Sequence, residues 1–261
     1  MGARLYPFIH IGPLTLGSYG LMVAIGLVCG FFILRADFAR RGVSADAEAI
    51  IGITGLAGLA GSRLYHLLQD ENRPAFFEHP LAELFSTMGF AFVGAILGGF
   101  IALVLLAKRF RIPMLLMLDA ASPAAAMGYG IGRIGCLISG DGDYGIPTTL
   151  PWGMSFPNGI VPTTERVHPT PIYEFLAAIL IAWILWRLGA RVIKKHAPTG
   201  IVFAAYLVLT GIARFLVEII RINPHDFYGM TNAQAASVVS VLAGAALVVY
   251  RLKITKENIR A

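Results

Sequence analysis

The stretch PLTLGSYGLMVAIGLVCGFFIL, residues 13–34, contains 22 residues and no charged side chain. A helix needs roughly 20 mostly apolar residues to cross the hydrocarbon core of a bilayer. The run is too long for a signal peptide, and it lacks the basic start and the small-residue cleavage site that a signal peptide carries. We therefore expect residues 13–34 to form a membrane-spanning helix.

The rest of the chain has the same character. Of its 261 residues, 57% are hydrophobic and only 14% are charged, whereas soluble domains carry about 25% charged residues. The sequence predicts an all-α integral membrane protein with about seven transmembrane helices, in a single polytopic domain covering residues 1–261. The six further apolar runs are 47–68, 88–107, 114–139, 170–187, 199–221 and 231–250.

Basic residues gather in every second connection between these runs. They follow the first, third, fifth and seventh runs, whereas the intervening connections are richer in acids. Basic loops stay in the cytoplasm, so we expect the N-terminus outside and the C-terminus in the cytoplasm. The net charge of +6 then reflects topology, and nucleic acid is not an expected partner. The basic residues concerned are Arg35, Arg40, Arg41, Lys108, Arg109, Arg111, Arg187, Arg191, Lys194, Lys195, Arg251, Lys253, Lys256 and Arg260.

The longest connection covers residues 140–169 and is rich in Gly, Pro and Thr. It is too short for a separate core, but a long connection of this kind suits an ordered segment above a functional site. By the predicted topology it lies outside. We therefore expect residues 140–169 to form an outer cap.

Three arginines, Arg63, Arg133 and Arg214, fall inside apolar runs. An arginine at the centre of a membrane costs at least about 2.5 kcal/mol, so such residues usually face a cavity or a partner. Arg214, Glu218 and Arg221 are spaced i, i+4 and i+7, which places one carboxylate between two guanidiniums on one helix face.

Two interpretations of this charged face compete. It is either a buried ion network that joins helices, or an anion site whose arginines offer the two-pronged hydrogen bonding that suits phosphate. Arg133 on a second predicted span favours the anion site. By the predicted topology Arg133, Arg214 and Arg221 approach the outer half of the membrane, where a phospholipid headgroup would meet them.

Other polar residues near the predicted outer ends of the spans are candidates with simpler alternatives. Tyr19 suits an interfacial aromatic anchor, and Glu174 suits the positive N-terminal end of a helix. Asp119 lies near an inner end, where we expect a structural role. The histidines have no metal-ligand spacing, so no metal site is expected. Two cysteines exclude a disulfide framework.

Five segments occur in an order that resembles the phosphatidylglycerol–prolipoprotein diacylglyceryl transferase family. Each is weak alone, but the ordered set runs over nearly the full chain. The segments are GPLTLGSYGLM (12–22), GSRLYH (61–66), GRIG (132–135) with GDGDYG (140–145), HPTPIYE (168–174) and GIARFLVEIIR (211–221).

The resemblance implies a multi-pass enzyme of the bacterial cytoplasmic (inner) membrane, with its active site towards the outer leaflet. Such an enzyme moves the diacylglyceryl group of phosphatidylglycerol onto the lipobox cysteine thiol in the signal-peptide region of a prolipoprotein. The reaction forms a thioether and releases glycerol phosphate. The resemblance implies that the enzyme is surrounded by membrane lipids and uses no metal or organic cofactor. Arg133 and Arg214 match the essential arginines of the family. Its other polar site positions are matched by Tyr19, Asp141, Glu218 and Arg221.

The sequence also departs from the family. Val93 stands where the family carries the histidine proposed as general base, and Cys136 and Ser139 replace two asparagines. By the predicted topology, the nearby candidates for a replacement base are His168, Asp141 and Asp143, and we select Asp141 and His168 from them. The predicted catalytic residues are thus Arg133, Arg214, Asp141 and His168. The predicted substrate-binding residues are Tyr19, Arg63, Glu174, Glu218, Arg221 and Gln234.

Two alternatives to this function remain open at this point. One is a transferase of the same fold with a different acceptor. The other is a membrane protein that binds phospholipid without catalysis or transports an anion. The intramembrane charges gather on the predicted outer side, and this one-sided distribution disfavours a transporter.

Overall fold

A computed structural model describes residues 6–12, 14–84 and 89–260 of the chain. The chain forms two compact units. The first contains the described residues up to Arg41 together with those from Leu118 onward, and the second is Gly42–Met117. Each unit is described by itself.

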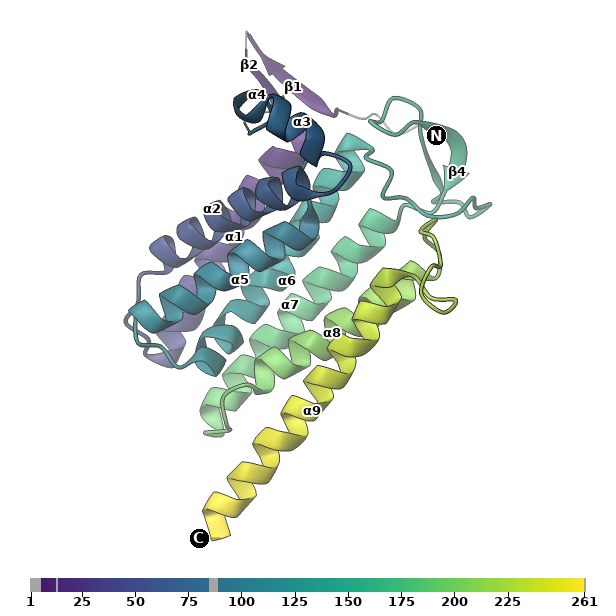
Figure 1. The fold of residues 1–261 in the computed structure, drawn as a ribbon. Coiled ribbons are helices and arrows are strands. Elements are labelled where there is room, and N and C mark those ends of the chain that lie inside the picture. The colour runs from purple at the N-terminus through teal and green to yellow at the C-terminus, as the bar shows by residue number, and fades with distance from the viewer. Residues whose placement is uncertain (1–5, 13, 85–88, 261) are drawn as a thin grey trace. The chain divides into compact units, whose positions relative to one another are not determined.

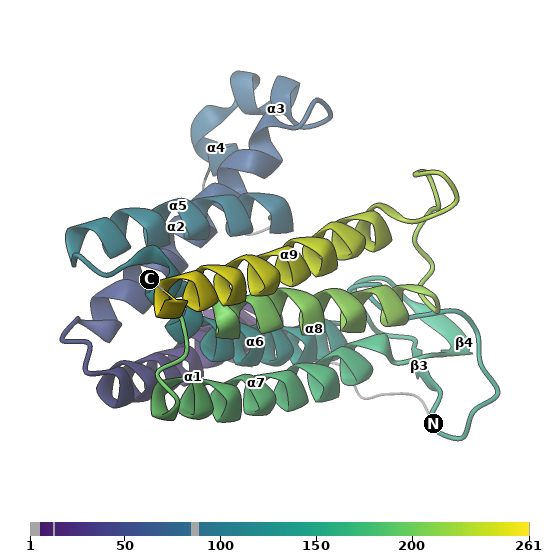
Figure 2. The same cartoon turned by 90° about the horizontal axis from the view of Figure 1, so that it is seen from below.

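Long helices dominate the first unit (Figure 1). Helix α8 packs on both α7 and α9, and it lies side by side with α9 in both views (Figures 1 and 2). Apolar side chains of α7 and α8, including Leu185 and Val202, form a fully buried core between these helices. The helices are α1 (Ser18–Arg41), α6 (Met114–Ser139), α7 (Thr170–Lys194), α8 (Ile201–Glu218) and α9 (Asn232–Arg260).

Asp119 on α6 is fully buried, and its carboxylate binds the start of α8. Its two oxygens accept hydrogen bonds from the backbone N–H groups of Gly200 and Phe203, each at 2.8 Å. The first N–H groups of a helix have no partner within the helix, and Gly200 has no side chain to supply one. Asp119 therefore caps α8 from a neighbouring helix, which confirms the structural role predicted for it.

A second buried carboxylate joins α1 to α7. Asp37 pairs with Arg40 and with Arg41, while the Arg40 guanidinium stacks 3.9 Å from the ring centre of Trp186 and donates to its carbonyl at 2.8 Å. A Cβ at Gly189 would collide with the Arg40 guanidinium, so the bare backbone of α7 lets this side chain lie flat against it.

The second unit contains α2 (Ala47–Leu68), α3 (Arg73–Glu78), α4 (Pro80–Leu84) and α5 (Phe92–Arg109). Helices α2 and α5 touch backbone to backbone, because Gly61 lies directly against Gly94 and Gly98. Small residues at such positions let membrane helices pack without a gap.

Six helices in the described part of the chain are long and apolar enough to cross a membrane, so the protein is a multi-pass membrane protein. They are α1, α5, α6, α7, α8 and the Asn232–Ile254 part of α9. Helix α2, predicted as a seventh span, has 22 residues but is not among them. Its Gly residues, together with Glu48, Arg63 and His66, reduce its hydropathy.

Two short hairpins accompany the helices and were not predicted. Strands β1 (Phe8–Ile11) and β2 (Leu14–Gly17) pair in front of α1, so this helix begins at Ser18 rather than at residue 13. Strands β3 (Met154–Phe156) and β4 (Thr163–Val167) pair within residues 140–169. Figure 1 shows β4 beyond the N-terminal end of α7 and the C-terminal end of α8. Residues 140–169, predicted to form a cap, thus contain a β-hairpin.

Candidate active site

Arginines from two helices and the turn after α8 converge on Glu174 of α7. Arg214 Nη1 lies 2.7 Å from Glu174 Oε1, Arg221 Nη1 lies 3.4 Å from Oε2, and Arg133 Nε lies 3.6 Å from Oε1. Glu174 is buried. One carboxylate thus links the guanidiniums of Arg133, Arg214 and Arg221.

The predicted charged face of residues 214–221 is confirmed. Glu218 Oε2 lies 2.8 Å from Arg214 Nη2 and 3.7 Å from Arg221 Nε, and Glu218 is fully buried. Its other oxygen accepts a hydrogen bond from the Asn223 amide. The helical spacing of these residues was enough to find this arrangement.

Asp143, in the loop after α6, forms the third carboxylate of the cluster. It pairs with Arg133 and with Arg221. Burial alone would raise the pKa of Asp143, but these two guanidiniums outweigh burial and hold its pKa below the ordinary value. Thr170 at the start of α7 donates to the Asp143 carbonyl and fixes the loop.

Charges in the cluster balance, since three guanidiniums face the carboxylates of Asp143, Glu174 and Glu218. An incoming anion must therefore exchange with carboxylates to reach the arginines. Arg214 is the most accessible of the three, with 25% of its side chain exposed, against 13% for Arg133 and 7% for Arg221. Arg214 and Arg133 are the guanidiniums that an anion can reach first.

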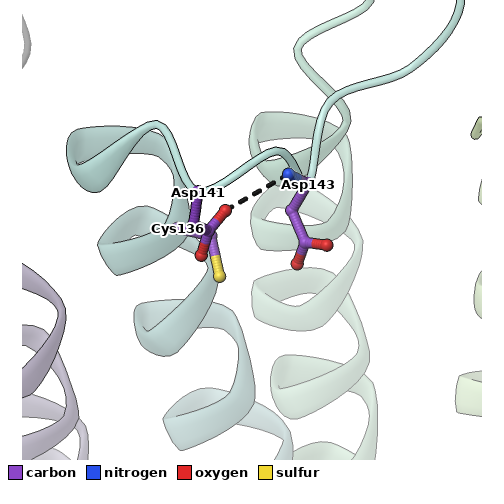
Figure 3. Close-up of side chains that lie close together, drawn as sticks. All are labelled: Cys136, Asp141 and Asp143. Atoms are coloured by element: carbon purple, nitrogen blue, oxygen red, sulfur yellow. Dashed lines mark hydrogen bonds between the residues drawn. The ribbon is translucent and has the colours of Figure 1, made fainter. Parts of the chain in front are cut away.

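Asp141 lies beside this cluster but takes part in no ion pair with an arginine in the described part of the chain. Figure 3 shows its carboxylate next to the Cys136 thiol, where the loop after α6 turns back, with the Asp143 N–H donating to it at 3.2 Å. Burial raises the pKa of Asp141 above the usual range of an aspartate. Asp141 is thus better suited than Asp143 to accept a proton.

Tyr129 on α6 belongs to the cluster, although the sequence analysis did not select it. Its hydroxyl donates to Glu174 Oε1, and its ring centre lies 4.9 Å from Arg133 Cζ. Tyr129 precedes Arg133 by four residues, which is one helical turn. This spacing could have drawn attention to it, since residues four apart in a helix share a face.

Comparison with known proteins connects this geometry to a family. The sequence profile described as "Prolipoprotein diacylglyceryl transferase" matches residues 7–250. The chain belongs to the prolipoprotein diacylglyceryl transferase family. It matches proteins named phosphatidylglycerol–prolipoprotein diacylglyceryl transferase in several bacteria. The relative from Clostridium tetani is 33% identical over 88% of this chain and 91% of its own length.

Two further relatives carry the same name. The protein of Geobacter sulfurreducens is 34% identical over 82% of this chain and 81% of its own length. That of Cupriavidus metallidurans is 33% identical over 93% of this chain and 91% of its own length. The similarity therefore extends over nearly the whole chain, as the ordered motifs predicted.

Among the other positions predicted from the family resemblance, Tyr19 lies close to the cluster. It packs on Gly135 of α6, two residues after Arg133, and its side chain is about half exposed. The structure thus places this residue at the edge of the cluster.

His168 and Gln234 have different partners. His168 Nδ1 lies 3.2 Å from the Tyr173 hydroxyl, which also accepts a hydrogen bond from Trp152 at 2.8 Å. Gln234 and Thr231 exchange hydrogen bonds with each other's backbone at 3.0 and 3.1 Å, which is a capping box at the start of α9. Within the described residues, neither side chain has a hydrogen bond or an ion pair with the three arginines.

Arg63 and Val93 belong to the second unit. Arg63 is buried, donates to the Gly89 carbonyl at 2.7 Å, lies 3.7 Å from Glu83 and faces the ring of Phe90. Val93, which the family resemblance predicts to stand in place of a histidine, is half exposed on α5. Arg63 thus links α2 to the segment that precedes α5.

Cys136, Asp141 and Asp143 could in principle hold a cation, because their ligand atoms lie within 4.8 Å of one another (Figure 3). A metal ion would have to displace both Arg133 and Arg221 from Asp143. Asp143 is therefore a partner of these arginines rather than a metal ligand, and we assign no metal to the three residues.

Proposed function

We propose that this protein transfers the diacylglyceryl group of phosphatidylglycerol to a cysteine thiol of a prolipoprotein, forming a thioether and releasing glycerol phosphate. The observation that carries this conclusion is the group of three arginines gathered on Glu174 inside a multi-pass membrane protein. Phosphatidylglycerol carries one phosphate, a group whose geometry matches the two-pronged hydrogen bonding of a guanidinium.

Arg133 and Arg214 hold the phosphate in this reaction. They are the more accessible arginines of the cluster, and both bind Glu174 Oε1, which a phosphate oxygen can replace. Negative charge grows on the phosphate as it leaves, so guanidiniums already in place stabilise the transition state more than the bound lipid. Arg221 and Glu218 hold these groups in position.

The sulfur must react as a thiolate, and a free cysteine has a pKa of about 8.5. The thiol proton passes to Asp141, the sulfur attacks the glycerol carbon that bears the phosphate ester, and the carbon–oxygen bond breaks. Its electron pair stays on the phosphate oxygen, and the proton leaves with the released glycerol phosphate or to water. Asp141 is favoured over His168 as the base because its carboxylate is free of arginine partners within the described residues, and its raised pKa suits a proton acceptor.

The topology that fits this function has seven spans, with α2 as the seventh. The N-terminus lies outside and the C-terminus in the cytoplasm of the bacterial inner membrane. Residues 1–261 form one polytopic domain, and residues 140–169 cap the site on the outer side. Basic residues at the C-terminal ends of α1, α5 and α7 support this orientation. Both substrates enter from the outer leaflet, the second through its signal-peptide region with the lipobox cysteine.

A transfer assay tests the function. Purified protein is mixed with a lipobox peptide in micelles of phosphatidylglycerol, and the peptide mass is followed. We expect a gain of one diacylglyceryl group, and no gain when the peptide cysteine is replaced by serine or when the lipid is the zwitterionic phosphatidylethanolamine. Lipid binding without any transfer would point to a non-catalytic binding protein. Transfer to another thiol only would point to a different acceptor.

A further inference from the structure

Tyr129 contacts both sides of the ion pair at the centre of the cluster. Its hydroxyl donates to Glu174 Oε1, the same oxygen that lies 2.7 Å from Arg214 Nη1 and 3.6 Å from Arg133 Nε. Its ring faces the Arg133 guanidinium, with 4.9 Å between ring centre and Cζ. Among the described tyrosines, only Tyr129 combines a side-chain hydrogen bond to a carboxylate of the cluster with a ring contact to one of its arginines.

We propose that Tyr129 is a positioning residue that makes Arg133 and Arg214 available to the substrate phosphate. This proposal rests on the proposed function, in which these two arginines bind that phosphate. It extends to a residue that the family motifs did not select.

The hydroxyl acts through the oxygen that it shares with the arginines. A carboxylate oxygen accepts only a few hydrogen bonds, so each additional donor weakens its hold on the others. Because the Tyr129 hydroxyl uses one of the acceptor positions of Glu174 Oε1, this oxygen binds Arg214 and Arg133 less tightly than it would without the tyrosine. A phosphate then displaces the carboxylate at lower cost.

The same hydroxyl matters again once the phosphate is bound. Glu174 is buried, with 3% of its side chain exposed, and a buried carboxylate that loses its partners is strongly destabilised. Tyr129 remains as a donor to Glu174 after the guanidiniums have turned to the phosphate. Both effects lower the free energy of the lipid-bound state relative to the empty state.

The ring has a separate task. An aromatic face within about 6 Å attracts a guanidinium, so the Tyr129 ring holds the plane of Arg133 while its partners change. Phenylalanine retains this face and loses the hydroxyl, whereas leucine loses both. These two substitutions therefore separate the two contributions.

The test is steady-state kinetics of transfer with variable phosphatidylglycerol. Removal of one hydrogen bond to a charged group is expected to raise KM for the lipid about tenfold in Tyr129→Phe, with kcat changed by no more than about twofold. The inhibition constant of added glycerol phosphate should rise by a similar factor. Tyr129→Leu should lower kcat as well, because Arg133 loses its orientation.

Tyr206→Phe is the matched control, since Tyr206 packs against the apolar core of α7 and α8. It should leave KM and kcat unchanged. The proposal is overturned if Tyr129→Phe has the KM and the inhibition constant of the control, or if it lowers only the amount of folded protein and kcat. Arg133→Ala distinguishes a failure of the proposed function from a failure of the role of Tyr129. If Arg133→Ala retains full transfer, the proposed phosphate site is wrong. If Arg133→Ala loses transfer but Tyr129→Phe has an unchanged KM, the phosphate site stands and only the role of Tyr129 is refuted.

Discussion

Replacing Asp119 by alanine should destabilise the protein more than the loss of any exposed helix cap. The carboxylate is fully buried and accepts two backbone hydrogen bonds at 2.8 Å, from Gly200 and Phe203. A hydrogen bond to a charged group contributes about 1.5–3 kcal/mol, and each donor left buried without a partner adds a cost. Since the two bonds share one carboxylate, we expect a loss of about 3 kcal/mol in total, which exceeds the roughly 0.5–2 kcal/mol usual for helix caps.

For a chain of this size such a loss lowers the melting temperature by roughly 6–12 °C. Thermal unfolding in detergent can be followed with a thiol-reactive dye in a Cys29→Ser background, because Cys29 is partly exposed whereas Cys136 is buried and becomes reactive only when the helices separate. Asp119→Asn should fall between the wild type and Asp119→Ala, because its amide oxygen still accepts a hydrogen bond.

Asp46 provides the matched control. It caps α2 with hydrogen bonds at 2.9 and 3.0 Å from Glu48 and Ala49, but it is exposed to solvent. Asp46→Ala should cost only about 0.5–1 kcal/mol. An equal or greater loss of stability in Asp46→Ala than in Asp119→Ala would refute the reasoning that burial sets the strength of the cap.

Three further outcomes follow from the site and the helix packing. Asp141→Asn should lower kcat about a hundredfold and remove the acid limb of the pH profile of kcat/KM. In the wild type this limb should lie above the ordinary aspartate pKa of about 3.9, because burial raises the pKa of Asp141. Asp143 has a lowered pKa in the folded protein, so its stabilising effect is present above about pH 4 and is lost as the pH falls through that lowered pKa. The difference in melting temperature between the wild type and Asp143→Asn should be full at pH 7 and should shrink as the pH falls below about 4. Gly61→Ala would bring a Cβ against the Gly94 carbonyl and should cost about 1–3 kcal/mol in thermal unfolding, whereas Gly20→Ala, which meets nothing within 4 Å, should be neutral.

The sequence was most informative where a single helix carries the signal. Apolar length predicted α6 as residues 114–139, and helical spacing predicted the pairing of Arg214, Glu218 and Arg221. The Thr231–Gln234 pair also follows a local pattern, because Thr-x-x-Gln before an apolar run is a capping box. That pattern was present in the sequence but was interpreted as substrate binding.

The central features of the cluster could not be predicted in the same way. Glu174 joins arginines that are 40 and 47 residues away along the chain, and Asp143 joins Arg221 across 78 residues. No periodicity within one helix encodes such contacts, which arise only when α6, α7 and α8 pack together. Tyr129 was missed for a related reason, since an aromatic residue in an apolar helix is usually a packing residue until its polar partner is known.

The most direct test of the account is the effect of removing each accessible arginine on the rate of transfer from phosphatidylglycerol to the peptide. Loss of one preorganised donor to a developing charge typically lowers kcat by about 10²–10³. We predict a loss of at least about a hundredfold in kcat for Arg133→Ala and for Arg214→Ala, and none for Arg187→Ala, whose guanidinium faces Trp183 in the C-terminal half of α7. Wild-type kcat in either Arg133→Ala or Arg214→Ala would contradict the claim that these guanidiniums stabilise the leaving phosphate.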